Sequence, residues 1–305
     1  MRKFQTKPVA GVAVLLAAVA FFCATARAQD AAATTGTNSL TAPDGRFGLF
    51  DELDHRSVYY QEFFPQPLLV DDTGLEQDGE LESSYLHTQA GSQHTDIVTA
   101  GVQKSFGLLT VEVSLPYERD YEPDEITQGV GNLELGVRYP LYQWVSADDG
   151  FDTTLGVGLE AGLPVNSAVS KNTELTPELF NDLKLGTSFS LQSVFSYSTL
   201  YGGGGVGGLR TFEYGFALGY AVPQTKITLP GIERFTPLLE LSGETDLNQA
   251  SAGQNDLLGS IGFRLDFKAI GDVQPSLGLG YVLPVDNDAR TEVHWGIATS
   301  LTLEF

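Results

Sequence analysis

The chain has 305 residues, and its 39 acidic residues against 17 basic ones give a formal net charge of −22. Nucleic-acid binding requires a basic surface, so this balance argues against a nucleic-acid partner. It is typical either of solvated acidic loops or of an acidic lumen that prefers cations.

The N-terminus has the three parts of a secretory signal peptide. A basic start is followed by an apolar run over residues 9–23, and Ala26 and Ala28 are the small residues of a cleavage site. Residues 1–28 are therefore predicted to be removed, together with the only cysteine, Cys23. Cleavage leaves 13 basic residues against 39 acidic ones, a formal charge of −26.

Residues 29–79 show no regular alternation. They begin with small polar residues and continue through a cluster of aromatic residues to Pro65 and Pro67. Composition of this kind favours a partly disordered periplasmic segment. We interpret residues 29–79 as an N-terminal preamble and a candidate plug on or inside the domain that follows.

From residue 80 to residue 305 the chain alternates between apolar and polar positions in blocks separated by Gly, Pro, Asn and Asp. Such alternation predicts strands with one apolar face. The clearest block is Thr211–Val222, with aromatic and aliphatic residues at even positions and small residues or Glu at odd ones. Twelve strands are predicted, at 80–89, 95–105, 108–117, 129–140, 151–163, 173–184, 188–199, 210–222, 235–245, 256–267, 273–283 and 291–305.

The composition of the two strand faces separates a membrane barrel from a soluble sandwich. The polar face consists mainly of Gly, Ser and Thr with scattered carboxylates, and the apolar face carries the large aromatic residues. This distribution is typical of a barrel whose apolar side chains face lipid. The sequence predicts an all-β fold, a transmembrane antiparallel up-and-down β-barrel of about 12 strands. Counts of 10 or 14 stay open, because 173–184 is a weak strand containing Pro177.

The last predicted strand alternates up to the terminal Phe305. An amphipathic strand that ends in an aromatic residue is typical of bacterial outer-membrane barrels. Phe305 is therefore predicted to be the assembly signal. The expected partners are periplasmic chaperones, the barrel-assembly machinery, outer-membrane lipid and a small-molecule solute, and the expected location is the outer membrane.

Strand parity predicts which charged residues line the lumen. Rings of charge inside a pore set ion preference, but carboxylates and Arg on neighbouring strands also stabilise a barrel by pairing. Both roles stay open for each residue. The predicted lumen-lining residues are Glu112, Glu134, Arg138, Glu160, Glu213, Glu240, Glu244, Arg264, Asp266 and Glu292.

Strand number and inward glycines together suggest a narrow channel. About eight strands give a filled interior and 16 to 18 an aqueous channel, so twelve lies between. Glycines on the inward face leave space near the wall, which is either open lumen or a seat for residues 29–79. They are Gly136, Gly156, Gly158, Gly162, Gly215, Gly219, Gly262, Gly278, Gly280 and Gly296.

The stretch Gly129-Val130-Gly131-Asn132-Leu133-Glu134-Leu135-Gly136-Val137-Arg138-Tyr139 resembles a known family. These are outer-membrane proteins associated with the meta-cleavage pathway of phenol degradation. In the corresponding strand, members of that family commonly have Asp where this chain has Asn132, and Lys where this chain has Arg138. The resemblance covers roughly residues 80–305. It implies a barrel with an uptake role and, as a second possibility, passage of hydrophobic or aromatic compounds.

Enzyme chemistry has little support in the sequence. A lipid hydrolase needs a Ser nucleophile beside a His base, but the pair His55 and Ser57 precedes the barrel. His87 and His94 with Asp96 make a weak metal set. We therefore expect a protein that is not an enzyme and has no cofactor and no metal. A sealed structural or adhesive barrel and, last, an outer-membrane lipid hydrolase are the alternatives.

Overall fold

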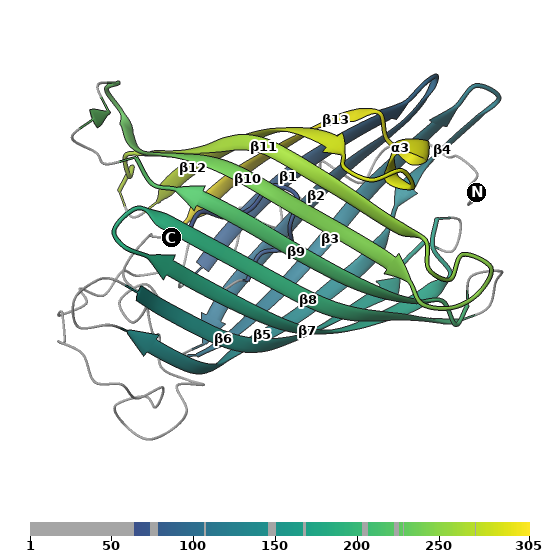
Figure 1. Ribbon diagram of the computed structural model, residues 1–305, viewed down its shortest axis with the longest axis horizontal. Coiled ribbons are helices and arrows are strands. Elements are labelled where there is room, and N and C mark those ends of the chain that lie inside the picture. Colours follow the sequence, from purple (N-terminus) through teal and green to yellow (C-terminus); the bar gives the residue numbers. More distant parts are fainter. Residues whose placement is uncertain are drawn as a thin grey trace.

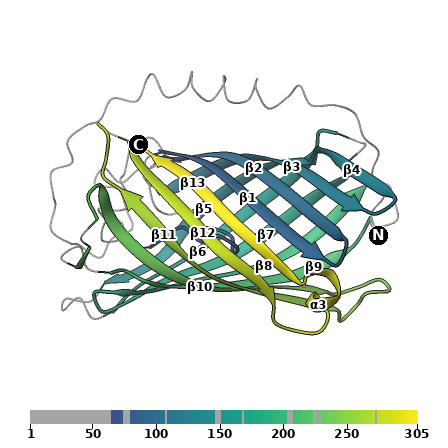
Figure 2. The ribbon, with the colours of Figure 1, turned by 90° about the horizontal axis from the view of Figure 1, so that it is seen from above.

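The computed structural model describes residues 64–73, 79–106, 108–145, 151–166, 169–202, 207–222, 226–227, 229–271 and 273–305. The predicted signal peptide, most of the predicted preamble, and His55 and Ser57 lie outside these residues. The described chain forms a closed antiparallel β-barrel (Figures 1 and 2).

Thirteen strands build the wall in the described residues, and apart from β4 they are 10 to 15 residues long. A transmembrane strand needs about 9–11 residues, so nearly all could span a bilayer. They are β1 (Gly79–Ala90), β2 (Gln93–Phe106), β3 (Leu109–Glu122), β4 (Glu125–Val130), β5 (Asn132–Val145), β6 (Phe151–Pro164), β7 (Asn172–Leu185), β8 (Phe189–Gly202), β9 (Arg210–Tyr220), β10 (Ile232–Asp246), β11 (Asn255–Phe267), β12 (Gln274–Pro284) and β13 (Trp295–Glu304).

The barrel has twelve wall positions, because β4 and β5 share one. Each strand pairs with its sequence neighbour, and β1 pairs with β13 to close the ring. β3 pairs with β4 from Tyr117 and with β5 up to Ser114, and β4 and β5 carry one extra residue between these two ladders. This is a β-bulge, and the Gly131 N–H donates to the Pro116 carbonyl across it, at 2.9 Å.

All twelve predicted strands are present, but several boundaries were wrong: β5, for example, continues to Val145 instead of ending at residue 140. Residues 118–128 were predicted as a connection, whereas β3 continues to Glu122 and β4 begins at Glu125, which leaves Pro123 and Asp124 as the turn. The charged residues of this hairpin lack apolar alternation, so their strand character comes only from backbone pairing. The sequence analysis therefore missed the pairing of β3 with β4, which extends past the apolar part of the strands.

The last strand begins at Trp295 rather than at residue 291. The four-residue helix α3 (Ala289–Glu292) precedes it, and Asp286 Oδ1 accepts the Ala289 N–H at 2.9 Å. Glu292 is exposed on this helix and does not lie on a strand. Its predicted place in the lumen was therefore wrong. No helix among the described residues is long and apolar enough to cross a membrane.

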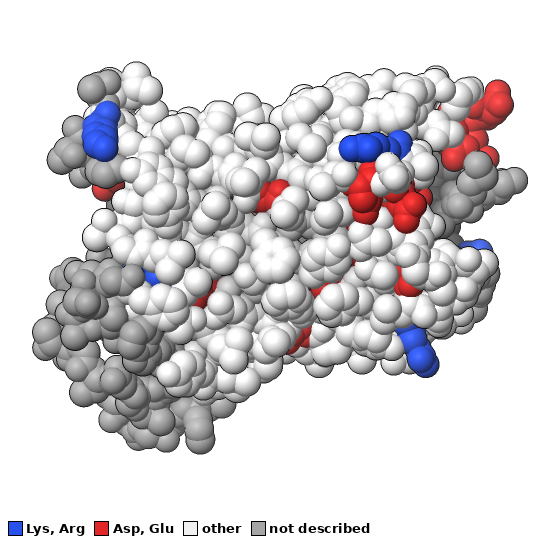
Figure 3. Space-filling model, viewed as in Figure 1, with Lys and Arg blue, Asp and Glu red and all other residues white. Residues whose placement is uncertain are grey.

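The alternation predicted from sequence separates two environments. On β9, for example, Phe212 and Leu218 point outward and are each 39% exposed, whereas Thr211 and Ala217 point inward and are buried. Figure 3 shows that charged side chains on this face gather towards the ends of the barrel and are sparse around its middle. An exposed apolar band of this size is expected to face lipid, not water.

The terminal residue packs at the start of the first strand. The Phe305 N–H donates to the Gly79 carbonyl at 2.9 Å, and a Cβ added at Gly79 would lie 2.7 Å from the Phe305 ring. Phe305 thus continues the β1–β13 ladder that closes the barrel.

Deleting Phe305 is expected to impair assembly, because the closing ladder loses its last hydrogen bond and the ring against Gly79. Most of the protein should then remain in the periplasm without heat-modifiable mobility in gel electrophoresis. Phe106→Ala is the matched control, because Phe106 is an exposed aromatic residue where β2 ends, at the same end of the barrel. Equal amounts of heat-modifiable barrel in the two variants would contradict the predicted role.

Candidate functional site in the barrel lumen

Residues 64–73, called here the lumenal segment, lie inside the barrel. Pro65, Gln66 and Val70 are buried although they belong to no strand. The Gln66 side chain hydrogen-bonds to Glu80 at 2.8 Å and to Thr302 at 2.6 Å, both on the wall. The space inside the wall is therefore partly filled by the chain itself.

The segment crosses the lumen from one wall to the opposite one. The Gln66 carbonyl accepts from Arg264 on β11 at 3.2 Å, and Asp71 pairs with Arg138 on β5 at 3.4 Å. β5 and β11 are six wall positions apart in either direction around the ring. The lumenal segment therefore spans the barrel and narrows it.

Glu240 on β10 anchors the middle of the segment. Its side chain is completely buried, and its two carboxylate oxygens accept the N–H groups of Leu68 and Leu69 at 2.7 and 2.8 Å. A buried carboxylate needs such donors, because loss of hydration is otherwise very costly. The predicted lumenal position of Glu240 is correct in geometry, but its partners are backbone groups of the segment.

Three inward glycines form a notch for the Leu68 side chain. A Cβ added at Gly262 or Gly280 would lie 3.1 Å from Leu68 Cδ1, and one added at Gly278 would overlap Cδ2. At Gly219 an added Cβ would lie 2.9 Å from Pro65. At these four positions the lack of a side chain makes room for residues 64–73. The sequence analysis left two roles open for the inward glycines, open lumen or a seat for the N-terminal segment, and these four glycines form a seat.

Val70 lies in a small apolar cluster on the lumenal side. It is buried with Phe180, Val194 and Ala217, and an added Cβ at Gly215 would overlap it. Burial of an aliphatic side chain is favourable by about 1.5–3 kcal/mol. This cluster therefore holds the segment against β7, β8 and β9.

Arg138 on β5 is the cationic centre of the lumen. Its guanidinium is 2% exposed and pairs with Glu112, with Glu178 at 3.3 Å and with Asp71 at 3.4 Å. The sequence placed Arg138 and Glu112 inward correctly. Glu160, on the neighbouring strand β6, is not among the ion pairs of Arg138 in the described residues.

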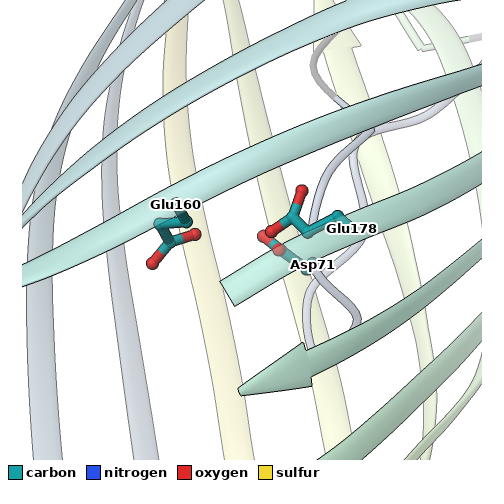
Figure 4. A group of neighbouring side chains, drawn as sticks. All are labelled: Asp71, Glu160 and Glu178. Atoms are coloured by element: carbon teal, nitrogen blue, oxygen red, sulfur yellow. The ribbon is translucent and has the colours of Figure 1, made fainter. Parts of the chain in front are cut away.

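Asp71, Glu160 and Glu178 nevertheless come close together (Figure 4). One carboxylate oxygen from each lies within 4.8 Å of the others, a spacing that a metal ion could bridge. Arg138 already supplies positive charge to Glu178 and Asp71. We therefore interpret Asp71 and Glu178 as part of the Arg138 ion-pair group, with Glu160 lying beside them.

Carboxylates also line the lumen between the segment and the end of the barrel that carries α3, a region called here the acidic vestibule. Glu134 accepts from Ser114, Glu213 accepts from Ser196 at 3.2 Å, and Glu244 lies directly across from Glu213 on β10. Among the described residues none of these three groups forms an ion pair with Lys or Arg. Three of the predicted acidic lining residues therefore lie on the α3 side of the segment.

The opposite side of the segment has paired charges. Arg264 is 1% exposed and donates to Thr302, and Asp266 accepts from Arg234 and from Ser276. These are the structural pairs that the sequence left open as an alternative. Arg264 and Asp266 thus stabilise the wall and hold the segment.

Sequence reasoning missed four inward residues on β7, namely Glu174, Glu178, Asp182 and Lys184. The strand alternates like the others, with Leu175 and Leu179 outward, so parity could have found them. Pro177 obscured it. This residue is exposed and interrupts the β7–β8 ladder without ending the strand.

A buried polar group lies beside the cluster around Val70. Gln192 is completely buried, and neither its Oε1 nor its Nε2 has a hydrogen-bond partner among the described residues. Its neighbours across the ladder are Asp182, which faces Thr73 of the segment, and Ala217. An unsatisfied buried polar group costs about 1–3 kcal/mol, which opposes the tight seating of the segment.

The histidines weighed as a weak metal set lie on the outward face. His87 Nδ1 is 2.8 Å from Asp96 Oδ1, and His94 Nε2 is 3.8 Å from Asp96 Oδ2. His87 also contacts the Trp295 ring, with ring centroids 5.2 Å apart. This group is separate from the lumen.

Comparison with known proteins finds similar structures but no similar sequences. No family model matches the sequence, and no curated protein does. Among solved structures, the COG4313 outer membrane channel from Pseudomonas putida F1 aligns with a TM-score of 0.49 and 16% identity, over 80% of this chain and 98% of that one. The NanC porin aligns with a TM-score of 0.43 and 11% identity, over 74% and 98%. The KdgM porin gives 0.39 and 12%, over 74% and 99%.

Replacing Arg138 by Gln is expected to lower the free energy of unfolding by about 3–5 kcal/mol, because buried Glu178 loses its cation. Asp71 is half exposed and can turn to water. Urea unfolding in detergent micelles measures the change. Arg290→Gln, in the exposed connection before β13, is the matched control and should stay within about 0.5 kcal/mol of the parent. Equal stability of the two variants would show that the ion-pair group does not stabilise the barrel.

Proposed function

We propose that the protein is an outer-membrane channel that lets small solutes pass by diffusion, with a preference for cations. The outward apolar band suits a lipid environment, and the closed wall satisfies its backbone hydrogen bonds. The predicted signal peptide and Phe305 support export to the outer membrane, where lipid and the assembly machinery are the expected partners.

The acidic vestibule is the observation that carries this proposal. Glu134, Glu213 and Glu244 face the lumen and form no ion pair with Lys or Arg among the described residues, and Glu160 lies beside Asp71. Asp71 is itself half exposed, so water reaches this level of the lumen. Carboxylates around a narrow aqueous path attract cations and repel anions.

The lumenal segment sets the width of the proposed path. It spans the barrel between β5 and β11 and is held by the Glu240 anchor, by the glycine notch and by Arg138. We propose that these residues act as the plug that the sequence suggested, so that open conductance requires the segment to move.

A path for hydrophobic or aromatic compounds is the second proposal. It is supported by the resemblance to the family associated with phenol degradation and by the apolar seats of Leu68 and Val70. An aromatic ring could occupy such seats if the segment moved away.

Neutralising Glu134 and Glu160 together, as Glu134→Gln and Glu160→Gln, is expected to weaken cation preference, because the vestibule loses the charge of Glu134 and the adjoining level of the lumen loses that of Glu160. The measurement is the reversal potential of single channels in a planar bilayer under a KCl gradient. Glu233→Gln is the matched control, because Glu233 lies at the opposite end of β10 next to its bulge. An unchanged reversal potential in the double variant would contradict the acidic-vestibule proposal.

A disulfide between residues 70 and 215 is expected to hold the pore closed. An ideal Cβ at position 215 lies 3.3 Å from Val70 Cβ, near the 3.5–4.5 Å separation of natural disulfides. Val70→Cys with Gly215→Cys should therefore conduct little when oxidised and regain conductance after reduction with dithiothreitol. Val70→Cys alone is the control and should be insensitive to dithiothreitol. Equal conductance of the oxidised and reduced double variant would show that the segment does not limit passage.

A further inference from the structure

The wall beneath Leu68 and Leu69 has the features of a binding site that the chain itself occupies. It combines the fully buried Glu240 carboxylate with the notch of Gly262, Gly278 and Gly280, called here the Glu240 seat. The segment fills this seat with two N–H donors and one isobutyl side chain. A ligand of the same shape would need N–H donors beside a small branched apolar group.

The charge of Glu240 is incompletely compensated in this arrangement. Among the described residues Glu240 forms no ion pair, and its hydrogen-bond donors are two neutral backbone N–H groups. The charge of Arg264 acts on Glu240 without direct contact, and Arg264 is itself engaged with Asp266, Gln66, Ser300 and Thr302. A primary ammonium supplies several N–H donors and a full positive charge, so it compensates a buried carboxylate better than neutral amides do.

Asp71 is the most exposed contact of the segment, which is otherwise buried at Val70 and Thr73 as well as at Gln66. Gln66 to Leu69 have buried contacts with Glu80, Glu240 and Arg264, whereas Asp71 is half exposed and lies 3.4 Å from Arg138. The exposure of Asp71 favours displacement that starts there.

We propose that the Glu240 seat binds a primary organic ammonium with a small branched apolar group, and that this ligand displaces the lumenal segment. The inference rests on the proposed function to the extent that the acidic vestibule brings cations to the seat. The segment competes as a tethered ligand, for which effective concentrations are about millimolar. Displacement is therefore expected at millimolar concentrations of a simple ammonium.

The test follows the position of the segment directly and does not depend on conductance. Val70→Cys places a thiol at a site that is buried while the segment is seated, and a neutral maleimide reports its exposure in the folded, detergent-solubilised protein. The probes are 3-methylbutylammonium, which carries the branched group of leucine, the neutral 3-methylbutan-1-ol, and ammonium ion. We expect only 3-methylbutylammonium to accelerate labelling, by severalfold at about 10 mM.

The Glu240→Gln variant in the Val70→Cys background should lose this response, because the carboxylate charge is gone. Glu233→Gln in the same background is the matched control and should keep it. Acceleration by the alcohol or by ammonium ion to the same extent, no acceleration by any probe, or a response that survives Glu240→Gln would each overturn the proposal. Heat-modifiable mobility confirms that each variant is folded.

A second variant keeps the test decisive if Glu240→Gln does not fold. Gly278→Ala adds a methyl group that overlaps Leu68 and leaves Glu240 in place. In the Val70→Cys background it should raise basal labelling of the introduced thiol and reduce the effect of 3-methylbutylammonium. Gly101→Ala is the control, because its added Cβ would meet Ser114 only at an ordinary 3.5 Å. Identical behaviour of the two variants would overturn the role of the notch.

Labelling and conductance together separate the two proposals. A labelling response without cation-selective conductance would refute the channel function and support the Glu240 seat. Cation-selective conductance without a labelling response would support the channel and refute the seat.

Discussion

Closure of the hydrogen-bonded ring is the constraint on which the rest of the structure depends. An open sheet edge in lipid would leave unpaired N–H and C=O groups, so a membrane sheet must close on itself. The β1–β13 ladder achieves this closure, and it brings Gly79 and Phe305 together at one end. Closure fixes the ring, and with it an interior that, in the part of the chain that the structure describes, is filled by inward side chains and the segment.

The interior is partly filled where small residues of the wall leave space and a segment of the same chain occupies it. Glycines at 262, 278 and 280 remove side chains from one wall, and Leu68 occupies the space. On the opposite wall the side chain is large and charged, and Arg138 reaches Asp71. One wall therefore fixes the segment by shape and a buried carboxylate, and the other holds it through a partly hydrated ion pair.

The sequence was sufficient for the strands and for most inward charges, because the barrel wall has a strict two-residue period. That period placed Glu134, Arg138 and Glu240 on the correct face. It failed at Glu292, where a short helix replaces the expected strand, and at Glu178, whose strand was discounted because of Pro177. It could not identify the Asp71–Arg138 pair, because residues 64–73 have no period and their position depends on contacts with distant parts of the chain.

The distribution of charge gives the lumen a direction. Glu134, Glu213 and Glu244 lie on the α3 side of the segment without an ion pair among the described residues, and Arg234 pairs with Asp266 on the other side. In the proposed channel, a cation entering from the α3 end would meet these three carboxylates first and the segment next. At the segment it would also meet Glu240, whose hydrogen-bond donors among the described residues are N–H groups of the segment itself. In the proposed channel, the residues that narrow the lumen would therefore compete with a cation for Glu240, which distinguishes the segment from a fixed part of the wall.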